Sequence, residues 1–142
     1  MDALIYESHA TAALTEAELE LVLLKSRTLN AMRGVTGALL KRGDRIVQYL
    51  EGEPAALART LARIEASTLH RGLRILAQAQ GVERVFDRWH MGFVDYQARH
   101  ARGEATEEWV QVVERVAKAP ADNAAARCLI EEWNTMSAPL AA

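Results

Sequence analysis

Residues 35–50 read VTGALLKRGDRIVQYL and contain the pattern that decides the fold. Two runs rich in branched apolar residues, Val35–Lys41 and Arg45–Leu50, flank the polar turn Arg42–Asp44. A short turn with glycine between two such runs is typical of a β-hairpin, because glycine accepts the positive φ that tight turns need. We therefore expect two antiparallel strands that are direct neighbours in a sheet.

Helical periodicity marks one segment on each side of this hairpin. Thr15 stands three residues before Glu18, which is a capping-box pattern that opens a helix. Apolar residues then recur at helical spacing up to Gly34, which is placed to end the helix. Pro54 suits the first turn of a second helix, whose apolar stripe runs to about Ser67.

Three further segments have the composition of strands: residues 3–6, Leu73–Ala79 and Trp89–Tyr96. The order strand, helix, strand, strand, helix, strand, strand predicts an α+β domain with a ferredoxin-like βαββαββ sheet and both helices on one face. From the right-handed crossover rule we expect the first strand beside the third and parallel to it.

Alternation along the strands predicts which side chains face the helices. Tyr6 shares a face with Leu4, and Gln48 shares one with Leu50, because successive strand residues point to opposite sides. If both sets face the helices, Tyr6 and Gln48 are neighbours at the centre of the sheet. Each of these buried polar groups then needs a hydrogen-bond partner, and taken alone the pair reads as ordinary satisfied core residues.

The C-terminal part of the chain differs in character, because residues 101–142 contain more acidic than basic residues. Two amphipathic helices are expected there, one capped by Thr106 and the other by Asp122. They are the natural cover for the second face of the sheet, although another protomer or partner on that face stays open. We therefore divide the chain into a domain of residues 1–97 and a helical extension of residues 98–142.

Composition narrows the class of protein. The chain has 142 residues, which suits one domain, and its formal net charge of -2 makes a nucleic-acid partner unexpected. A single cysteine, Cys128, allows no intramolecular disulfide, and no Cys/His grouping has the spacing of a metal site. We find no secretory signal and no apolar run of about 20 residues, so we expect a cytoplasmic protein without a membrane span.

Five motifs follow one another between residues 3 and 96. Each is nonspecific by itself, but together and in this order they resemble a BLUF domain, a blue-light sensor that uses FAD. The motifs are LIYES (4–8), N-x-x-x-GVTG (30–37), IVQYLEG (46–52), His70 and W-x-MGF (89–93).

The resemblance implies a flavin between the two helices and assigns roles to the matching positions. Tyr6 is implied as the photochemical donor of an electron and a proton, and Gln48 as the amide that bridges it to the flavin. Trp89 and Met91 are implied as photoactive neighbours, with the direction in which Trp89 points left open. The implied cofactor-binding residues are Tyr6, Val22, Asn30, Ile46, Gln48, Arg63, Ile64, Ser67, His70 and Met91.

The expected flavin is FAD, with FMN and riboflavin left open because the motifs describe only the ring pocket. Three positions depart from the family pattern. Leu29 replaces a frequent polar residue, Ser67 a frequent acid and Ile46 a frequent aromatic residue. These changes bear on flavin affinity and ring contacts, whereas Tyr6 and Gln48 are retained.

The resemblance implies a photoreceptor rather than an enzyme. We expect the signal to pass to a downstream protein, and we expect a homo-oligomer, a dimer or larger. One rival hypothesis is a flavin-free protein-interaction module on the same fold. Another is an acylphosphatase-type hydrolase, which would need an arginine in an anion loop near the first strand, but residues 7–14 contain none.

Overall fold

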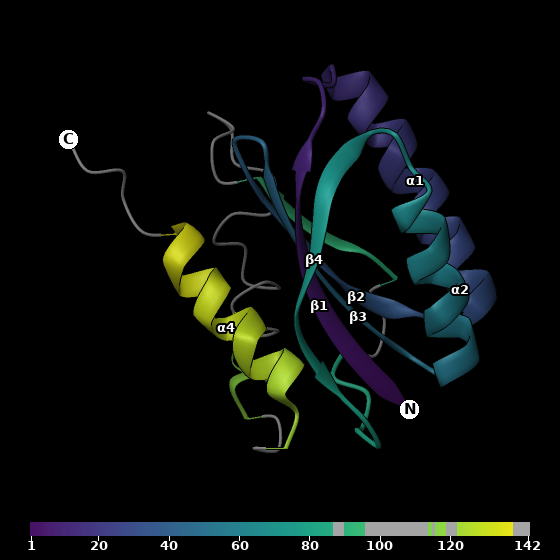
Figure 1. Cartoon of the computed structure of the whole chain (residues 1–142), viewed down its shortest axis with the longest axis vertical. Helices are drawn as coiled ribbons and strands as arrows, with labels where there is room; N and C mark the ends of the chain where they lie inside the picture. The colour runs from purple at the N-terminus through teal and green to yellow at the C-terminus, as the bar shows by residue number, and fades with distance from the viewer. Residues whose placement is uncertain (87–89, 96–113, 115, 119–121, 138–142) are drawn as a thin grey trace.

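The computed structural model describes residues 1–86, 90–95, 114, 116–118 and 122–137. The described elements are β1 (Asp2–Ala10), α1 (Glu16–Arg33), β2 (Thr36–Arg42), β3 (Arg45–Gly52), α2 (Pro54–Glu65), β4 (His70–Ala79), β5 (Gly92–Asp95) and α4 (Ala124–Ser137). The strands form one sheet in the order β4-β1-β3-β2-β5. Helices α1 and α2 lie on one face of this sheet and α4 on the other (Figure 1). The expected α+β fold is confirmed.

The expected hairpin is present, because β2 and β3 pair antiparallel along their length. Gly43 in the turn between them has a φ of +61°, a left-handed conformation that glycine adopts without steric penalty. Gly37 meets a different demand. A Cβ at this position would collide with the backbone carbonyl of Tyr49, so the close approach of the two strands requires glycine.

The direction of β1 was predicted wrongly. β1 lies beside β3 as expected, but the two strands are antiparallel, with Asp2 opposite Gly52 and His9 opposite Arg45. Helix α1 returns the chain across one face of the sheet, so β1 and β2 point the same way. β3 is the second arm of a hairpin and lies between them, so it runs against both. The crossover rule therefore applies to β1 and β2, which are not neighbours in the sheet.

Local signals set both ends of α1. The hydroxyl of Thr15 accepts the Glu18 N–H at 3.2 Å, and the Glu18 carboxylate accepts the Thr15 N–H at 3.1 Å, which confirms the capping box. At the other end Gly34 has a φ of +67° and donates its N–H to the Ala31 carbonyl at 3.3 Å. Pro54 occupies the first turn of α2, as expected.

The alternation rule places Tyr6 and Gln48 correctly. They lie directly opposite each other in the β1–β3 ladder, on the face that α1 and α2 cover. The buried apolar core on this face comprises Leu4, Tyr6, Val35, Leu50, Leu57 and Ile64.

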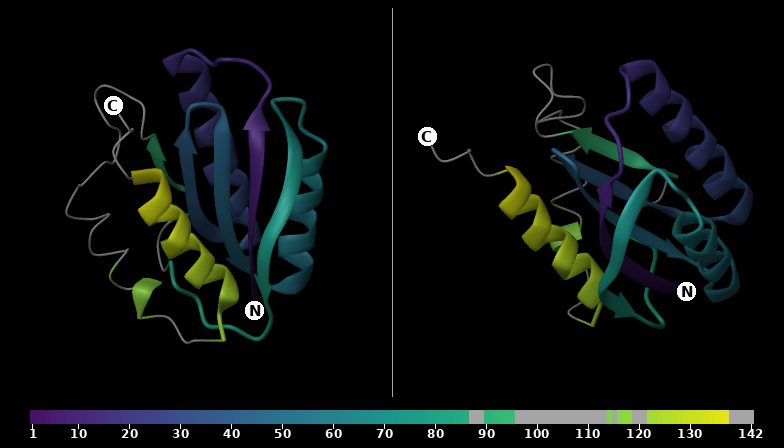
Figure 2. Two further views of the ribbon diagram at one scale, coloured as in Figure 1. Left: turned by 60° about the vertical axis from the view of Figure 1, so that its left-hand side comes forward. Right: turned by 45° about the horizontal axis from the view of Figure 1, so that its top comes forward.

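The second face of the sheet is covered by the C-terminal extension of the same chain (Figure 2). Ile5 and Val47 of the sheet belong to one buried cluster with Ala126 and Leu129 of α4. Val116, which precedes α4, is buried in the same cluster. Over its described part, the extension therefore packs on the sheet as expected.

An ion-pair cluster also attaches α4 to the sheet. Arg45 of β3 contacts Glu132 of α4 at 2.6 Å and Glu7 of β1 at 2.8 Å. Arg74 of β4 contacts the other oxygen of Glu7 at 2.7 Å. Hydrogen bonds from Arg45 and Arg74 lower the pKa of Glu7, so this carboxylate stays charged and paired.

Several boundaries differ from the prediction. β1 continues to Ala10, because its backbone pairs with β3 on one side and β4 on the other. β4 begins already at His70. α4 is capped by Asn123 instead of Asp122, because the Asn123 Oδ1 accepts the Ala126 N–H at 3.0 Å. Both residue types are good caps, so the sequence did not distinguish them.

Some expected features lie outside the described residues, among them Trp89, Tyr96 and the start of the helix capped by Thr106, of which residues 114, 116 and 117 are described and helical. β5 is described from Gly92 to Asp95, within the expected range. In the part of the chain that is described, no helix has the length and apolarity needed to cross a membrane.

The capping box gives a test of the local signals. Replacing Thr15 with alanine removes the hydroxyl that accepts the Glu18 N–H, and we expect the free energy of unfolding to fall by about 1 kcal/mol. Urea denaturation measures this loss. Thr28→Ala is the matched control, because Thr28 lies inside the same helix and its hydroxyl bonds only to the Leu24 carbonyl. An equal loss in both variants would contradict the capping role.

Candidate functional site

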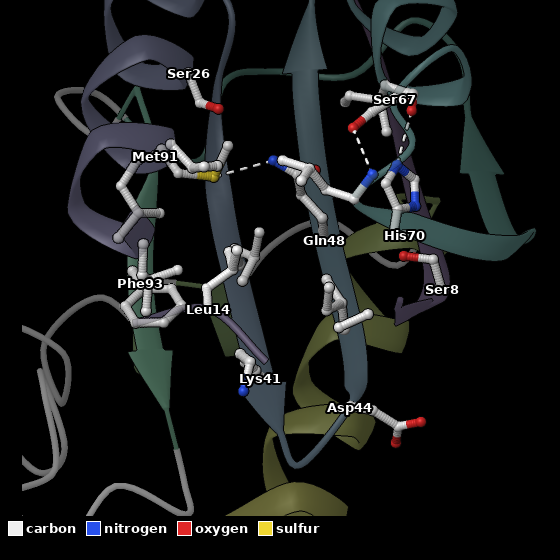
Figure 3. A pocket seen from close by; sticks show the side chains of 18 of the residues that line it. Ser8, Leu14, Ser26, Lys41, Asp44, Gln48, Ser67, His70, Met91 and Phe93 are labelled. Carbon is white, nitrogen blue, oxygen red and sulfur yellow. Dashed lines mark hydrogen bonds between the residues drawn. The ribbon is translucent and has the colours of Figure 1, made fainter. Parts of the chain in front are cut away.

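A cavity of about 780 Å³ lies over the helix-facing side of the sheet. Its volume falls in the range of roughly 300–1,000 Å³ that is typical of cofactor and ligand pockets. The strands β1, β2, β3 and β5 contribute to it together with α1 and the end of α2 (Figure 3). Much of its wall is apolar, formed by Leu19, Val22, Leu23, Leu39, Ile46 and Ile64.

A hydrogen-bonded series of three side chains forms one wall of the cavity. The Tyr6 hydroxyl donates to Gln48 Oε1. Gln48 Nε2 in turn donates to the sulfur of Met91 at 3.0 Å (Figure 3). Tyr6 and Gln48 are only 3% and 2% exposed. The two partners define the orientation of the amide, because its oxygen faces the phenol and its nitrogen faces the thioether.

Two residues of α1 hold the backbone next to Met91. Asn30 donates its Nδ2 to the His90 carbonyl at 2.7 Å, and Arg27 donates its Nε to the Met91 carbonyl at 2.9 Å. The imidazole of His90 contacts the Val35 carbonyl at 3.1 Å. Helix α1 therefore fixes the segment from which the Met91 side chain reaches Gln48.

Unsatisfied polar atoms surround the cavity among the described residues. Asn30 Oδ1, Ser8 Oγ, Arg63 Nε and His70 Nδ1 are buried without a hydrogen-bond partner. Such an atom costs about 1–3 kcal/mol, and folded proteins normally satisfy it. Together these atoms mark places where a polar ligand would supply the missing partners.

His70 has a defined orientation at the end of α2. Its Nε2 lies 2.7 Å from the Ile64 carbonyl, and a carbonyl only accepts, so Nε2 carries the proton in this bond. In the neutral ring Nδ1 is then a free acceptor near the cavity.

Burial controls the charges at the site. Burial raises the pKa of Tyr6 well above its usual value, and the Coulomb effect of Arg63 lowers it only in part. Burial and the nearby Arg33 lower the pKa of Arg63. Tyr6 therefore stays a neutral phenol with its proton in the hydrogen bond to Gln48.

Most of the residues predicted for the site lie on this one cavity. Asn30 lies behind its wall, fully buried. Trp89 lies outside the described residues, so its position stays a prediction. The predicted residues that line the cavity are Tyr6, Val22, Ile46, Gln48, Arg63, Ile64, Ser67, His70 and Met91.

Some residues at the site were not predicted from the sequence. Ser8 lines the cavity, and the alternation that placed Tyr6 on this face was sufficient to find it. Phe93 also lines it, from β5. No sequence pattern marks Arg27 as a residue of the site, because its partner is the backbone carbonyl of Met91, far away in the sequence.

The arrangement suits a flat heteroaromatic ligand with one polar edge. Apolar side chains can pack on the faces of such a ring, while Ser8, Arg63 and His70 offer donors and acceptors to its edge. Across the described ranges, no group of three or more His, Cys, Asp or Glu side chains could hold a metal ion.

Comparisons with known proteins bear on the family and the fold of this chain. The family model described as "BLUF: Sensors of blue-light using FAD" matches residues 1–92. The structure "BlrB - a BLUF protein, dark state structure" is 28% identical with a TM-score of 0.64, over 67% of this chain and 72% of that chain. The structure "BlsA photo-activated state" is 26% identical with a TM-score of 0.62, over 67% and 70%.

A longer protein shares the fold. Klebsiella pneumoniae BlrP1 with FMN and cyclic diGMP is 24% identical with a TM-score of 0.68, over 90% of this chain and 33% of that chain. This likeness shows the fold alone. No curated protein sequence matched the chain.

The burial of Tyr6 predicts an unusual titration. Because burial raises the pKa of Tyr6, we expect its phenol to stay protonated up to about pH 11, where an exposed tyrosine is largely ionised. The tyrosinate absorbance of the folded protein should then be the same for Tyr6→Phe and the unchanged chain. In denaturant the variant should lose one of the three tyrosines from the titration. A missing step near pH 10 in folded Tyr6→Phe would contradict the burial argument.

Proposed function

This chain belongs to the BLUF family of blue-light sensors that use FAD, and we propose that it is a photoreceptor that binds a flavin beside Tyr6 and Gln48. The observation that carries the proposal is the hydrogen-bonded series from Tyr6 through Gln48 to Met91 on the wall of the cavity.

The residues around the cavity fit a flavin ring system. Such a ring has apolar faces and an edge of carbonyl and N–H groups. Val22, Ile46 and Ile64 would pack on the ring, and the unsatisfied atoms of Ser8 and Arg63 would pair with its edge. The remaining contacts would come from Ser67, His70 and Met91.

A bound flavin would supply the absorption of blue light and an acceptor for an electron and a proton. Tyr6 is the proposed donor of both, because its buried phenol keeps its proton and is hydrogen-bonded to the Gln48 amide. Gln48 passes the proton, since a carboxamide carries an acceptor and a donor that exchange places by rotation or tautomerism. Tyr6 would recover its electron and proton before the red-shifted state forms, so that only the rearranged Gln48 distinguishes this state from the dark state.

Rearrangement of Gln48 would change its contact with Met91. In the described orientation Nε2 donates to the sulfur at 3.0 Å. A half-turn of the amide brings Oε1 to the sulfur instead, and a thioether has no proton to donate. The hydrogen bond is then lost and the Met91 side chain is released at the start of β5. Trp89 is proposed as a further responding residue in the same segment.

The proposed flavin is FAD, in line with the description of the family. FMN is the flavin of the BlrP1 structure, and riboflavin has the same ring. A flavin-free interaction module on this fold is the alternative function. The unsatisfied atoms Ser8 Oγ and Arg63 Nε of the cavity wall argue against it, because a module without ligand leaves them unpaired.

We propose that residues 1–97 are the sensor and residues 98–142 pass the signal to a partner protein. The role is sensing, without catalytic turnover. The free thiol of Cys128 on α4 suits a reducing compartment, so we place the protein in the cytoplasm.

The outer surface of α1 supports self-association. Leu21, Leu24 and Met32 are 67%, 61% and 78% exposed, although the opposite side of this helix already forms the cavity wall. A helix that is apolar on both sides is usually covered on both. We propose a dimer or larger oligomer in which this surface is buried.

The photochemical proposal is tested by absorption spectra of the purified protein before and after blue light. We expect a flavin band that shifts reversibly to the red. Tyr6→Phe removes the electron and proton donor and Gln48→Glu removes the amide, so both variants should bind flavin and lose the shift.

Tyr49→Phe is the matched control for these variants. Tyr49 follows Gln48 in β3 but points to the opposite face of the sheet, where its hydroxyl donates to Glu51. This variant should keep the shift. A colourless protein after reconstitution with flavin would overturn the proposal and favour the interaction module.

The α1 surface is tested by Leu24→Arg. Burying a leucine side chain contributes about 1.5–3 kcal/mol, so a charge at this position should weaken self-association at least about tenfold. Sedimentation velocity over a range of concentrations measures the change. Ala58→Arg adds the same charge at an exposed position of α2 and should leave association unchanged. Unaltered association in Leu24→Arg would exclude this surface.

A further inference from the structure

A carboxylate is buried on the sheet face that α4 covers, away from the cavity. Glu51 of β3 is 0% exposed. Its Oε1 accepts the Tyr49 hydroxyl at 3.0 Å and the Val85 N–H at 2.8 Å. Its Oε2 accepts the Phe86 N–H at 2.7 Å and the Thr36 hydroxyl at 3.0 Å. All these partners donate, which suits a carboxylate, since an ionised carboxyl group only accepts.

Arg84 extends this network to the end of α1. Its Nη1 donates to the Thr36 hydroxyl at 2.6 Å, and its Nη2 donates to the carbonyl of Gly34 at 2.9 Å. Gly34 is the residue that ends α1. The Thr36 hydroxyl thus links the Arg84 guanidinium to the Glu51 carboxylate. This nearby positive charge reduces the free-energy cost of burying the carboxylate.

Tyr49 extends the network in the other direction, to α4. The Asn123 amide donates its Nδ2 to the Tyr49 hydroxyl at 3.3 Å. The same amide caps α4 through its Oδ1, which accepts the Ala126 N–H at 3.0 Å. The ring of Tyr49 also packs on that of Phe86, with centroids 5.5 Å apart. The first turn of α4 is therefore bonded to the strand that carries Gln48.

This network lies directly behind the proposed photochemical site. Tyr49 follows Gln48 in β3, so the two side chains point to opposite faces of the sheet. Glu51 holds the backbone of Val85 and Phe86, which leads along the chain to Met91. The elements that a change at Gln48 and Met91 would displace are thus tied to one buried carboxylate.

We propose that Glu51 is a positioning residue that couples the Gln48–Met91 contact to α4, and that the Tyr49–Asn123 hydrogen bond is the contact that transmits the change. The proposal rests on the proposed photochemistry. In this proposal, a change at the Gln48–Met91 contact reaches α4 through Glu51 and the Tyr49–Asn123 hydrogen bond.

A second polar attachment of α4 is a weaker candidate for this path. Arg45 and Glu132 form an ion pair with side-chain exposures of 30% and 18%. Ion pairs that water reaches contribute little and tolerate movement. Buried hydrogen bonds cannot be exchanged for bonds to water, so a shift of one partner forces the other to follow.

The test is hydrogen exchange of α4 in the dark and under blue light, with the absorption shift recorded on the same samples. Tyr49→Phe keeps the ring and removes the hydroxyl. Asn123→Ser keeps a good helix cap and removes the amide donor. Glu132→Gln is the control, because it removes the ion pair with Arg45 and leaves the network intact.

We expect illumination to change the exchange of α4 amides in the unchanged chain by roughly tenfold. Tyr49→Phe and Asn123→Ser should keep the absorption shift and lose most of that difference, while Glu132→Gln should keep both. An undiminished light-dependent difference in the first two variants would overturn the proposal. So would an equal loss in Glu132→Gln.

Hydrogen exchange of the protein kept in the dark tests this proposal independently of the photochemistry. Asn123→Ser should speed the exchange of the Val85 and Phe86 amides by about threefold or more, although Asn123 does not contact them in the described network. Unchanged exchange at these amides would overturn the coupling. An absent absorption shift with the dark effect present would instead contradict only the proposed photoreceptor.

Discussion

The pairing of Tyr6 with Gln48 across the central β1–β3 ladder is the constraint on which the site depends. Strand side chains alternate, so a slip of one residue in this ladder would move one of the two groups to the opposite face. β1 and β3 are flanked by β4 and β2, which fixes the register from both sides. A phenol and an amide at the middle of a buried face cannot reach water. They therefore bond to each other, and the amide takes Met91 as its second partner.

Buried polar groups on the two faces of the sheet differ in whether their hydrogen bonds are satisfied. On the helix face, polar atoms such as Ser8 Oγ and Arg63 Nε have no partner and belong to residues that line a cavity. On the α4 face, the oxygens of Glu51 are saturated by donors from two strands and the segment after β4. The first face is consistent with a ligand, and the second is consistent with a rigid attachment. β3 carries Gln48 and Tyr49 to these two faces in adjacent positions, so the two functions share one strand.

Features that depend on neighbours in the sequence could be predicted. The hairpin, the capping box at Thr15 and the glycine that ends α1 are decided within a few residues, where turn and cap chemistry acts. The family resemblance also led to nine of the residues that line the cavity. The direction of β1 relative to β3 was predicted wrongly. It depends on the insertion of β3 between β1 and β2, which the order of elements along the chain does not reveal. Arg27 and Glu51 were not predicted at all, since each bonds to backbone groups at large sequence separation, which no sequence pattern marks.

The sequence by itself determined the element order, the two alternating faces and the types of residue that meet at the centre of the sheet. Periodicity of 2 and 3.6 residues is a property of the local backbone, so these features need no tertiary contact. Only the tertiary structure decided which polar atoms are left unsatisfied, which carboxylate is saturated and which residue caps α4 on the sheet. Hydrogen-bond satisfaction depends on the position of groups from several elements at once, and those positions exist only after the sheet and both helical layers have packed.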